Sequence, residues 1–172
     1  MKWTWIDSPL GPMLAMSDGD ALCGLHFHDD KYVPDIAPEW QRDDGLPLFR
    51  RTCTEVAEYF AGKRHRFGLP LAPQGTDWQK RVWQVLVTIP YGETTTYGTM
   101  AATLGNRNAS RAVGAANGRN PIAVVIPCHR AIGADGSLTG YAGGLARKDA
   151  LLRLEGVVPV GAMQRTPDLT GL

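Results

Sequence analysis

The sequence has no long apolar run, and this absence excludes a helix that spans a membrane. None of its segments approaches the roughly 18 consecutive apolar residues that such a helix needs. The opening segment, MKWTWIDSPL, has no apolar stretch of the kind a secretory signal carries, so we expect a cytoplasmic protein without membrane contacts. With 44% hydrophobic and 20% charged residues, the 172-residue chain has the composition of an ordinary globular protein.

Cysteine is scarce. Cys23, Cys53 and Cys128 form an odd, widely spaced set that does not make a disulfide framework, and free thiols fit a reducing compartment. His26 and His28 lie close to Cys23 in sequence, but in a strand both histidines would face away from it, and a tetrahedral zinc site would lack a fourth ligand. We therefore expect no metal, and the sequence offers no cofactor motif.

Net charge is also small, at +1, but its sign differs between the two halves of the chain. Residues 1–75 carry eight Lys and Arg against eleven Asp and Glu, whereas residues 76–156 carry nine against five. This asymmetry indicates that the second half meets an anionic partner, with a solvated basic face as the plainer interpretation.

The first half of the sequence favours short strands and one helix. Turn residues separate WTWI, LAMS and ALCGLHF, which we expect to be strands, and residues 29–47 are rich in Asp and Pro and are expected to form a loop. Leu48–Phe60 is predicted to be a helix, whose core face by helical spacing is Phe49, Cys53, Val56 and Phe60. Residues 63–75 are expected to connect two lobes.

The second half is predicted to be mainly helical. Thr76 and Gln79 have the spacing of a capping box, and the apolar stripe that follows ends at Pro90. Two short helices, Tyr97–Leu104 and Ala109–Asn117, flank a tight turn in the manner of a helix-turn-helix, although any pair of packed helices would look similar.

The helix over Ala109–Asn117 is unusual because one long side chain, Arg111, stands among small residues in ASRAVGAANG. Such a backbone can approach a shallow DNA groove, with the arginine projecting into the DNA; a packed core helix with a surface arginine is the alternative. Further along, Asp135-Gly136 predicts a hairpin that would be the wing of a winged helix, and Leu145–Leu154 predicts a final helix.

The stretch VVIPCHRAIG places a cysteine in an unusual setting. Ile122–Ile126 has the length and β-branched content of a buried strand, and Pro127 favours the end of a strand ladder. Cys128 would then emerge from the core beside His129 and Arg130, two groups that favour a thiolate when they lie nearby. A small buried cysteine that only fills space is the alternative interpretation.

Together with GTDWQKRVWQVLVTIPYGETTTYGTMA, SRAVGAANGRNP and GSLTGYAGGLARKDALLRLEG, the IPCHR stretch resembles the O6-alkylguanine-DNA alkyltransferases, also called methylated-DNA–protein-cysteine methyltransferases. The resemblance implies an α/β fold: a small, ribonuclease H-like α/β domain at 1–75, a mainly helical, winged-helix-like domain at 76–157, and a tail at 158–172. It also implies stoichiometric DNA repair, in which an alkyl group passes from O6-alkylguanine to the protein, with O4-alkylthymine as a second candidate substrate.

The resemblance also assigns roles to matching residues. Cys128 matches the alkyl acceptor, and His129 and Glu155 match the pair that activates it through a water. Tyr97 matches the tyrosine that assists the leaving guanine. Asn120 matches the residue that supports the cysteine turn. DNA contacts are implied at Tyr97, Ala109, Ser110 and Arg111, and the guanine pocket at Tyr141, Ala142 and Gly143. Some relatives have serine where this chain has Ala142, so a hydroxyl contact to the base is missing here.

The chemistry agrees with these roles. Displacement at an alkyl carbon needs a thiolate and no cofactor, and burial would raise the pKa of Cys128, so a base is required. Adjacent residues rarely face each other, which makes a water between Cys128 and His129 sensible. A carboxylate at Glu155, near a helix C-terminus, is disfavoured by the macrodipole unless it orients the histidine; an exposed glutamate is the default. Without a nearby resolving cysteine, the protein should act once.

The expected partner is double-stranded DNA with alkylated bases, bound by a monomer that can act cooperatively. The nucleotide must leave the duplex to reach a buried cysteine, and Arg111 would fill the gap. Tyr97 would hydrogen-bond N3 of the departing base, with a tyrosine bonded to backbone as the alternative. Two other classes stay open: a winged-helix regulator or lesion-binding module with an inert cysteine, and a cysteine hydrolase or thiol oxidoreductase.

Overall fold

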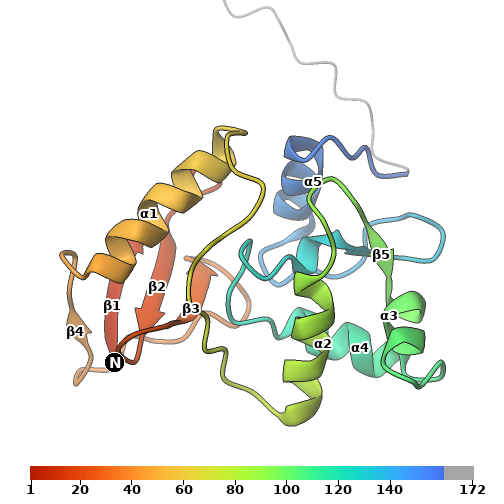
Figure 1. Cartoon of the computed structure of the whole chain (residues 1–172), viewed down its shortest axis with the longest axis horizontal. Coiled ribbons are helices and arrows are strands. Elements are labelled where there is room, and N and C mark those ends of the chain that lie inside the picture. Colours follow the sequence, from red (N-terminus) through yellow and green to blue (C-terminus); the bar gives the residue numbers. More distant parts are fainter. Residues whose placement is uncertain (161–172) are drawn as a thin grey trace, which may run out of the picture.

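The computed structural model describes residues 1–160, and its N-terminal half is a small sheet with one long helix packed along it (Figure 1). The elements are β1 (Lys2–Ile6), β2 (Met13–Ser17), β3 (Leu22–Phe27), β4 (Gln41–Arg42) and α1 (Pro47–Phe60), with the strands in the order β3-β2-β1-β4. Strands β1 to β3 pair antiparallel, while β4 joins β1 in parallel. The three predicted strands and the helix are confirmed, but the predicted loop over residues 29–47 is wrong in part because it contains β4.

The C-terminal half is mainly helical, as predicted. Its elements are α2 (Asp77–Val87), β5 (Thr95–Thr96), α3 (Tyr97–Thr103), α4 (Ser110–Gly118), the 3-10 helix η1 (Cys128–Arg130), β6 (Ala131–Ile132) and α5 (Leu145–Leu154). The predicted capping box begins α2: the Gln79 backbone N–H donates to the Thr76 hydroxyl, and the Thr76 backbone N–H donates to the Gln79 side chain. Within residues 1–160, no helix is long and apolar enough to cross a membrane.

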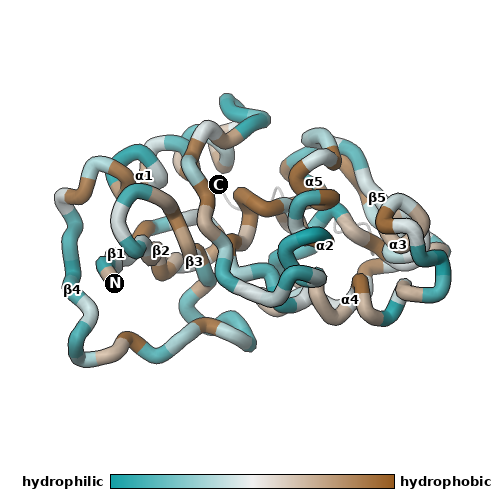
Figure 2. The backbone as a smooth tube through the Cα atoms, turned by 60° about the horizontal axis from the view of Figure 1, so that its bottom comes forward, coloured by the Kyte–Doolittle hydropathy of each residue, from teal (hydrophilic) through white to brown (hydrophobic). Residues whose placement is uncertain are grey.

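The two halves share one hydrophobic core. Phe49, Val56 and Tyr59 of α1 belong to the same buried cluster as Val82 of α2 and Leu151 of α5. The other face of the sheet carries a smaller cluster, in which Leu14, Met16 and Cys23 pack against Trp3, Val33 and Trp40. Figure 2 shows apolar segments in the strands and between β3 and α5, with hydrophilic segments on the outer turns. This continuous packing lets side chains of the N-terminal half reach the site described below.

The apolar stretch before Cys128 is not the predicted strand. Ile122 makes one isolated bridge to Leu25, and the chain then turns, so that the Ile126 N–H donates to the Ile122 carbonyl at 3.0 Å. Val124 has a positive φ of 70°, which a β-branched residue rarely adopts. All five residues from 122 to 126 are buried, so the apolar run indicated burial correctly but conformation wrongly. Pro127 accordingly precedes η1 and ends no strand ladder.

The predicted wing is a turn, and the predicted hairpin around it is wrong. Gly136 has a φ of 82°, and the Gly133 N–H donates to the Ser137 carbonyl at 2.9 Å, so the turn itself is present. Strand β6 leads into this turn, but its partner is β5, which lies earlier in the chain and pairs with it in parallel. The strand before the turn therefore does not pair with the segment after it, as a hairpin requires. The final helix, α5, is confirmed. Most of the predicted tail, from residue 161 onward, lies outside the described residues.

Candidate active site

Cys128 begins η1 and is 5% exposed, and two asparagines hold the backbone around it. The Asn120 amide donates to the Ile126 carbonyl at 2.8 Å, and its oxygen accepts from the Ile122 N–H at 3.0 Å. The Asn117 amide lies 3.4 Å from the Cys128 carbonyl. Asn120 therefore closes the buried turn that ends at the cysteine, since a turn without a sheet leaves backbone groups that a side chain must satisfy.

The surroundings of the Cys128 sulfur keep it a thiol in the resting protein. Burial raises the pKa of Cys128 to about 11, against opposing effects of an Asn120 hydrogen bond and the Lys148 cation. Lys148 is fully buried, and its ammonium donates to the carbonyls of Ala131 at 2.6 Å and Thr139 at 2.8 Å. Burial lowers the pKa of Lys148 to about 8, and a thiolate at Cys128 opposes this change. Because the thiolate is the reactive form, the site needs a base.

His129 is placed to be that base through a buried network. Its Nε2 lies 2.8 Å from Oε1 of Glu155, and both side chains are shielded from solvent. A carboxylate only accepts hydrogen bonds, so Nε2 carries the proton and Nδ1 is left as an acceptor. Nδ1 is buried and has no hydrogen-bond partner in the described part of the protein. Burial lowers the pKa of His129, against the opposing effect of Glu155, so the imidazole is neutral at pH 7.

Arg130, which would favour a thiolate if it lay near the sulfur, pairs with Glu155 in the structure. Its guanidinium donates to both oxygens of Glu155, at 2.9 and 2.8 Å, and to the Ile89 carbonyl at 2.6 Å. The physical reason is that a buried carboxylate requires a partner of opposite charge. Burial alone would raise the pKa of Glu155, but hydrogen bonds from His129 and Arg130 hold it well below its usual range. Glu155 therefore stays ionised, and an exposed glutamate is excluded at this position, where it is 6% exposed.

A cavity of about 440 Å³ lies beside Tyr97 and contains two of the three predicted pocket residues. It is lined by Lys31, Tyr32, Tyr97, Gly114, Gly118, Thr139, Gly140, Tyr141 and Ala142. Burial is the main cause that raises the pKa values of Tyr97 and Tyr141, and a thiolate at Cys128 acts in the same direction on both. Gly143, the third predicted pocket residue, lies instead against Phe27 and the Tyr141 ring.

The Tyr97 hydroxyl is bonded to backbone in this state. It donates to the Thr139 carbonyl at 3.1 Å and accepts from the Thr139 hydroxyl at 3.2 Å. The raised pKa keeps the phenol protonated at pH 7, so it remains a proton donor. The Tyr141 hydroxyl, by contrast, is buried without a hydrogen-bond partner among residues 1–160.

The N-terminal half holds the loop that lines this cavity. The Lys31 N–H donates to the Ala142 carbonyl at 3.0 Å. Arg147 donates to the carbonyls of Leu10 and Gly143 and pairs with Asp29, which ties strand-side residues to the start of α5. Two of the cavity-lining residues, Lys31 and Tyr32, thus come from the predicted loop 29–47.

The predicted DNA-contacting residues lie at the start of α4. Ala109 is the buried residue that precedes the helix, Ser110 is its half-buried first residue, and Arg111 is exposed in its first turn. Gly114 and Gly118 of the same helix line the cavity beside Tyr97. Arg111 is therefore an exposed cation on the helix that supplies two walls of this cavity.

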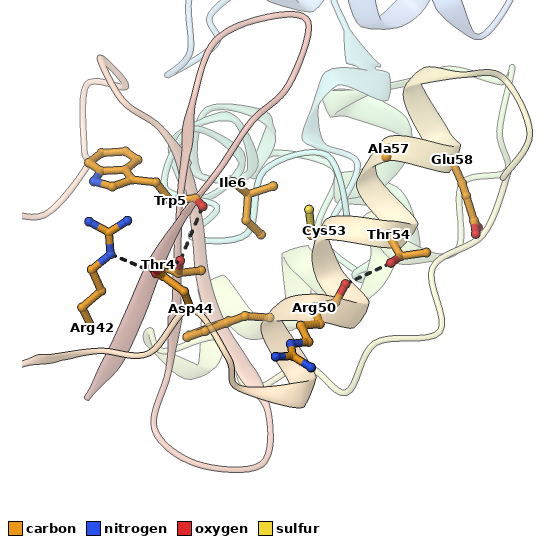
Figure 3. Close-up of a pocket in the computed structure, with 11 residues that line it drawn as sticks. Thr4, Trp5, Ile6, Arg42, Asp44, Arg50, Cys53, Thr54, Ala57 and Glu58 are labelled. Carbon is orange, nitrogen blue, oxygen red and sulfur yellow. Dashed lines mark hydrogen bonds and ion pairs between the residues drawn. The ribbon is translucent and has the colours of Figure 1, made fainter.

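Cys53 is exposed, and its predicted place on the core face of α1 is wrong. The buried face of the helix is Phe49, Thr52, Glu55, Val56 and Tyr59. Cys53 projects instead into a groove of about 660 Å³ between α1 and the sheet, which Figure 3 shows. The groove is lined by Thr4, Trp5, Ile6, Arg42, Asp44, Phe49, Arg50, Cys53, Thr54, Ala57 and Glu58, so no histidine faces this thiol. Within residues 1–160, no three His, Cys, Asp or Glu side chains gather as metal ligands.

Two buried polar residues of the site escaped the sequence prediction, Lys148 and Tyr59. A signal for Lys148 was present: Lys148, Leu151, Leu152 and Glu155 follow the i, i+3, i+4, i+7 spacing of one helix face, so two charges lie on an apolar stripe. Charged residues at buried positions need partners and often belong to functional sites. Tyr59 gave no such signal, because it lies outside the core face predicted for its helix and is buried only in the structure.

Comparison with known proteins agrees with this geometry. Residues 1–73 match the family model for the 6-O-methylguanine DNA methyltransferase ribonuclease-like domain, and residues 77–157 match that for the DNA-binding domain of the same family. A methylated-DNA–protein-cysteine methyltransferase of Methanosarcina acetivorans is 47% identical over 156 residues, which cover 91% of this chain and 99% of the relative. One of Mycobacterium tuberculosis is 49% identical over 150 residues, which cover 87% and 89%.

The fold is likewise similar to a crystal structure of Mycobacterium tuberculosis OGT in complex with DNA. The TM-score is 0.86 at 47% identity, and the match covers 91% of this chain and 93% of the other. The fold and the buried cysteine site together define the class of DNA-binding proteins that carry a nucleophilic thiol. Within that class, the chain belongs to the 6-O-methylguanine DNA methyltransferase family.

Proposed function

We propose that Cys128 accepts the alkyl group in the reaction of this family, the repair of DNA by alkyl transfer to a cysteine. The sulfur would attack the alkyl carbon on O6 of a guanine. An S–C bond forms, the C–O6 bond breaks, and its electron pair stays with the base. The single observation that carries the assignment is the buried His129–Glu155 pair directly after a buried cysteine. Cys53 has no comparable partner in its groove.

The thiol proton would pass to Nδ1 of His129 through one water molecule. Nδ1 is the imidazole atom that Glu155 leaves as an acceptor. The resulting imidazolium would be stabilised by the ionised Glu155 carboxylate at 2.8 Å, in the way a carboxylate supports a histidine base in other nucleophilic enzymes. Asn120 supports the turn that holds the sulfur in place.

The departing guanine would be an anion and would take a proton or hydrogen bond from Tyr97 at N3. For this the phenol must leave the Thr139 carbonyl, its present acceptor at 3.1 Å. The nucleotide must leave the duplex to reach a sulfur that is 5% exposed, and Arg111 would enter the space that it vacates. Ala109 and Ser110 would let the start of α4 approach the DNA, and Tyr141, Ala142 and Gly143 would form the loop over the base.

The test is intact-mass measurement and peptide mapping after incubation with duplex DNA that carries O6-methylguanine. We expect one methyl group per chain, on the peptide that contains Cys128. A bound but unmodified protein would favour the second candidate, a lesion-binding or regulatory module, and repeated turnover would favour a cysteine hydrolase. The same assay with O4-methylthymine measures the second candidate substrate.

We also propose the division into domains at 1–75 and 76–157, and a monomer that acts in the cytoplasm on alkylated double-stranded DNA without a cofactor or metal. Support for a reducing compartment comes from Cys23, Cys53 and Cys128, which are all free. Gel filtration with and without DNA measures the oligomeric state and any cooperative assembly.

A further inference from the structure

Tyr59 belongs to α1 of the N-terminal half, yet its hydroxyl reaches the charged centre of the C-terminal half. The phenol donates to Oε1 of Glu155 at 2.7 Å, across a separation of 96 residues in sequence. Tyr59 is fully buried, and Glu155 is 6% exposed. A hydrogen bond to a charged acceptor in such a place is stronger than one between neutral groups.

The oxygen that Tyr59 contacts is the one that holds His129. Oε1 of Glu155 accepts from Tyr59 at 2.7 Å, from His129 at 2.8 Å and from Arg130 at 2.8 Å. Oε2 accepts from Arg130 at 2.9 Å and from the Gly92 N–H at 3.3 Å. Tyr59 thus helps to fix the rotation of the carboxylate and draws part of its negative charge away from the imidazole.

The phenol remains a donor at every working pH. Burial is the main cause that raises the pKa of Tyr59 far above its usual value, and the Glu155 charge and the hydrogen bond to it act in the same direction. The contact is therefore a permanent part of the network.

We propose that Tyr59 is a positioning residue for alkyl transfer, which holds the Glu155 carboxylate against His129 from the N-terminal half of the protein. The inference rests on the proposed function of His129 and Glu155. It also gives the N-terminal half a direct part in the reaction, through one hydroxyl group. Without that hydroxyl, the Glu155 carboxylate would be held less firmly in the orientation that meets His129. While it keeps that contact, its less neutralised charge would act more fully on the imidazole.

Tyr91 is a matched control. Its ring packs edge-on against that of Tyr59, with centroids 6.1 Å apart, and its hydroxyl donates to the Leu154 carbonyl at 3.2 Å. Removing either hydroxyl deletes one hydrogen bond from the same region. Only Tyr59→Phe deletes a bond to the carboxylate.

The experiment measures single-turnover methyl transfer from O6-methylguanine duplex DNA by Tyr59→Phe, Tyr91→Phe and wild type, from pH 5.5 to 8.5. Since each chain reacts once, the final amplitude counts correctly folded protein, while the rate constant describes only those chains. A destabilised variant therefore still gives a readable rate.

For Tyr59→Phe we expect the rate constant to fall at least about tenfold at neutral pH, because a donor to a buried charge is lost. We also expect the decline of the rate on acidification to begin at a higher pH, since the less neutralised carboxylate favours the imidazolium. Tyr91→Phe should change neither quantity. A normal rate in Tyr59→Phe, an unmoved acid limb, or equal changes in Tyr91→Phe would each overturn the proposal.

Glu155→Gln separates this inference from the proposed function. If that variant reacts normally, the proposed relay itself is wrong, and Tyr59 loses its role with it. If Glu155→Gln is slow and Tyr59→Phe is normal, only the inference about Tyr59 fails. In the double variant, removal of the Tyr59 hydroxyl should add no further loss of rate to Glu155→Gln.

Discussion

The surroundings of Cys53 and Cys128 show that a thiol and a hollow do not by themselves make a reactive site. The groove beside Cys53 is the larger of the two, at about 660 Å³, and its thiol is exposed. The cavity beside Tyr97 and Tyr141 is about 440 Å³, and the Cys128 thiol, which is 5% exposed, is not among its lining residues. Of the two thiols, only Cys128 has a neutral histidine, an ionised carboxylate and a buried lysine in its surroundings. Burial disfavours the thiolate at Cys128, and in the proposed mechanism the His129–Glu155 pair would take up the thiol proton.

The largest expected effect comes from replacing Cys128, with the replacement of Cys53 as the comparison. Cys128→Ser should abolish methyl uptake from O6-methylguanine DNA, because a hydroxyl is a far poorer nucleophile at alkyl carbon than a thiolate. Cys53→Ser should react at the wild-type rate with one methyl per chain. Intact mass after exhaustive incubation measures both variants. Methyl uptake by Cys128→Ser would assign the chemistry to a different residue.

Arg111→Ala distinguishes the step that takes the nucleotide out of the duplex from the transfer of the alkyl group to Cys128. Transfer from duplex DNA should slow by about ten- to a hundredfold, since unstacking a base costs a few kcal/mol and the inserted side chain offsets part of it. Reaction with free O6-benzylguanine should change less than about twofold, because no base must be extruded. Rate constants on the two substrates are compared under the same conditions. Equal losses would mean that Arg111 supports the fold or the cysteine itself.

Methylation should distinguish the two thiols by their effect on stability. A methyl group on Cys128 adds volume to a packed place, and overpacking costs about 1–3 kcal/mol. At about 2–4 °C per kcal/mol for a chain of this size, the methylated protein should melt about 2–12 °C lower. The control is S-methylation of the exposed Cys53 in Cys128→Ser, which should leave the melting temperature of that variant unchanged. An unchanged midpoint after methylation of Cys128 would show that the cavity accepts the group without strain.

The contrast between the two cysteines could be predicted from sequence only in part. Helices with a clear beginning and a helical stripe were predicted well: Thr76 and Gln79 begin α2, and α5 ends where predicted. Cys53 was misplaced because the helix turns its buried face toward Thr52 and Glu55, whose polar groups find partners. The stretch from 122 to 126 was misassigned because a fully buried turn and a buried strand have the same apolar composition.

The contacts that complete the site were beyond the reach of sequence patterns. The Tyr59–Glu155 contact joins residues 96 positions apart. It depends on how α1 packs against the C-terminal half, which no local spacing encodes. The contact of Arg130 with Glu155 likewise depends on where α5 ends.

The smallest expected effect concerns Lys148, a buried cation near Cys128 with no counterpart among the residues that line the Cys53 groove. The pKa of Lys148 is lowered from 10.5 to about 8, so between these values the folded protein has lost a proton that the unfolded chain retains. Stability contributed by this group therefore rises with pH through 8, by about 1 kcal/mol between pH 7 and 8.5. The raised pKa of Cys128, from 9.0 to about 11, acts in the opposite direction only above pH 9.

Urea unfolding at pH 7 and 8.5 measures the effect, with Lys148→Met to remove the titrating group and Lys80→Met as the exposed control. Wild type and Lys80→Met should both gain about 1 kcal/mol across this interval, whereas Lys148→Met should gain much less. Lys148→Met should also be less stable at pH 7, because the carbonyls of Ala131 and Thr139 lose their donor. An equal gain in all three proteins would mean that the carbonyls of Ala131 and Thr139 keep Lys148 protonated throughout. The cation would then favour the thiolate at Cys128 at every working pH, and the two cysteine environments would differ by a full permanent charge.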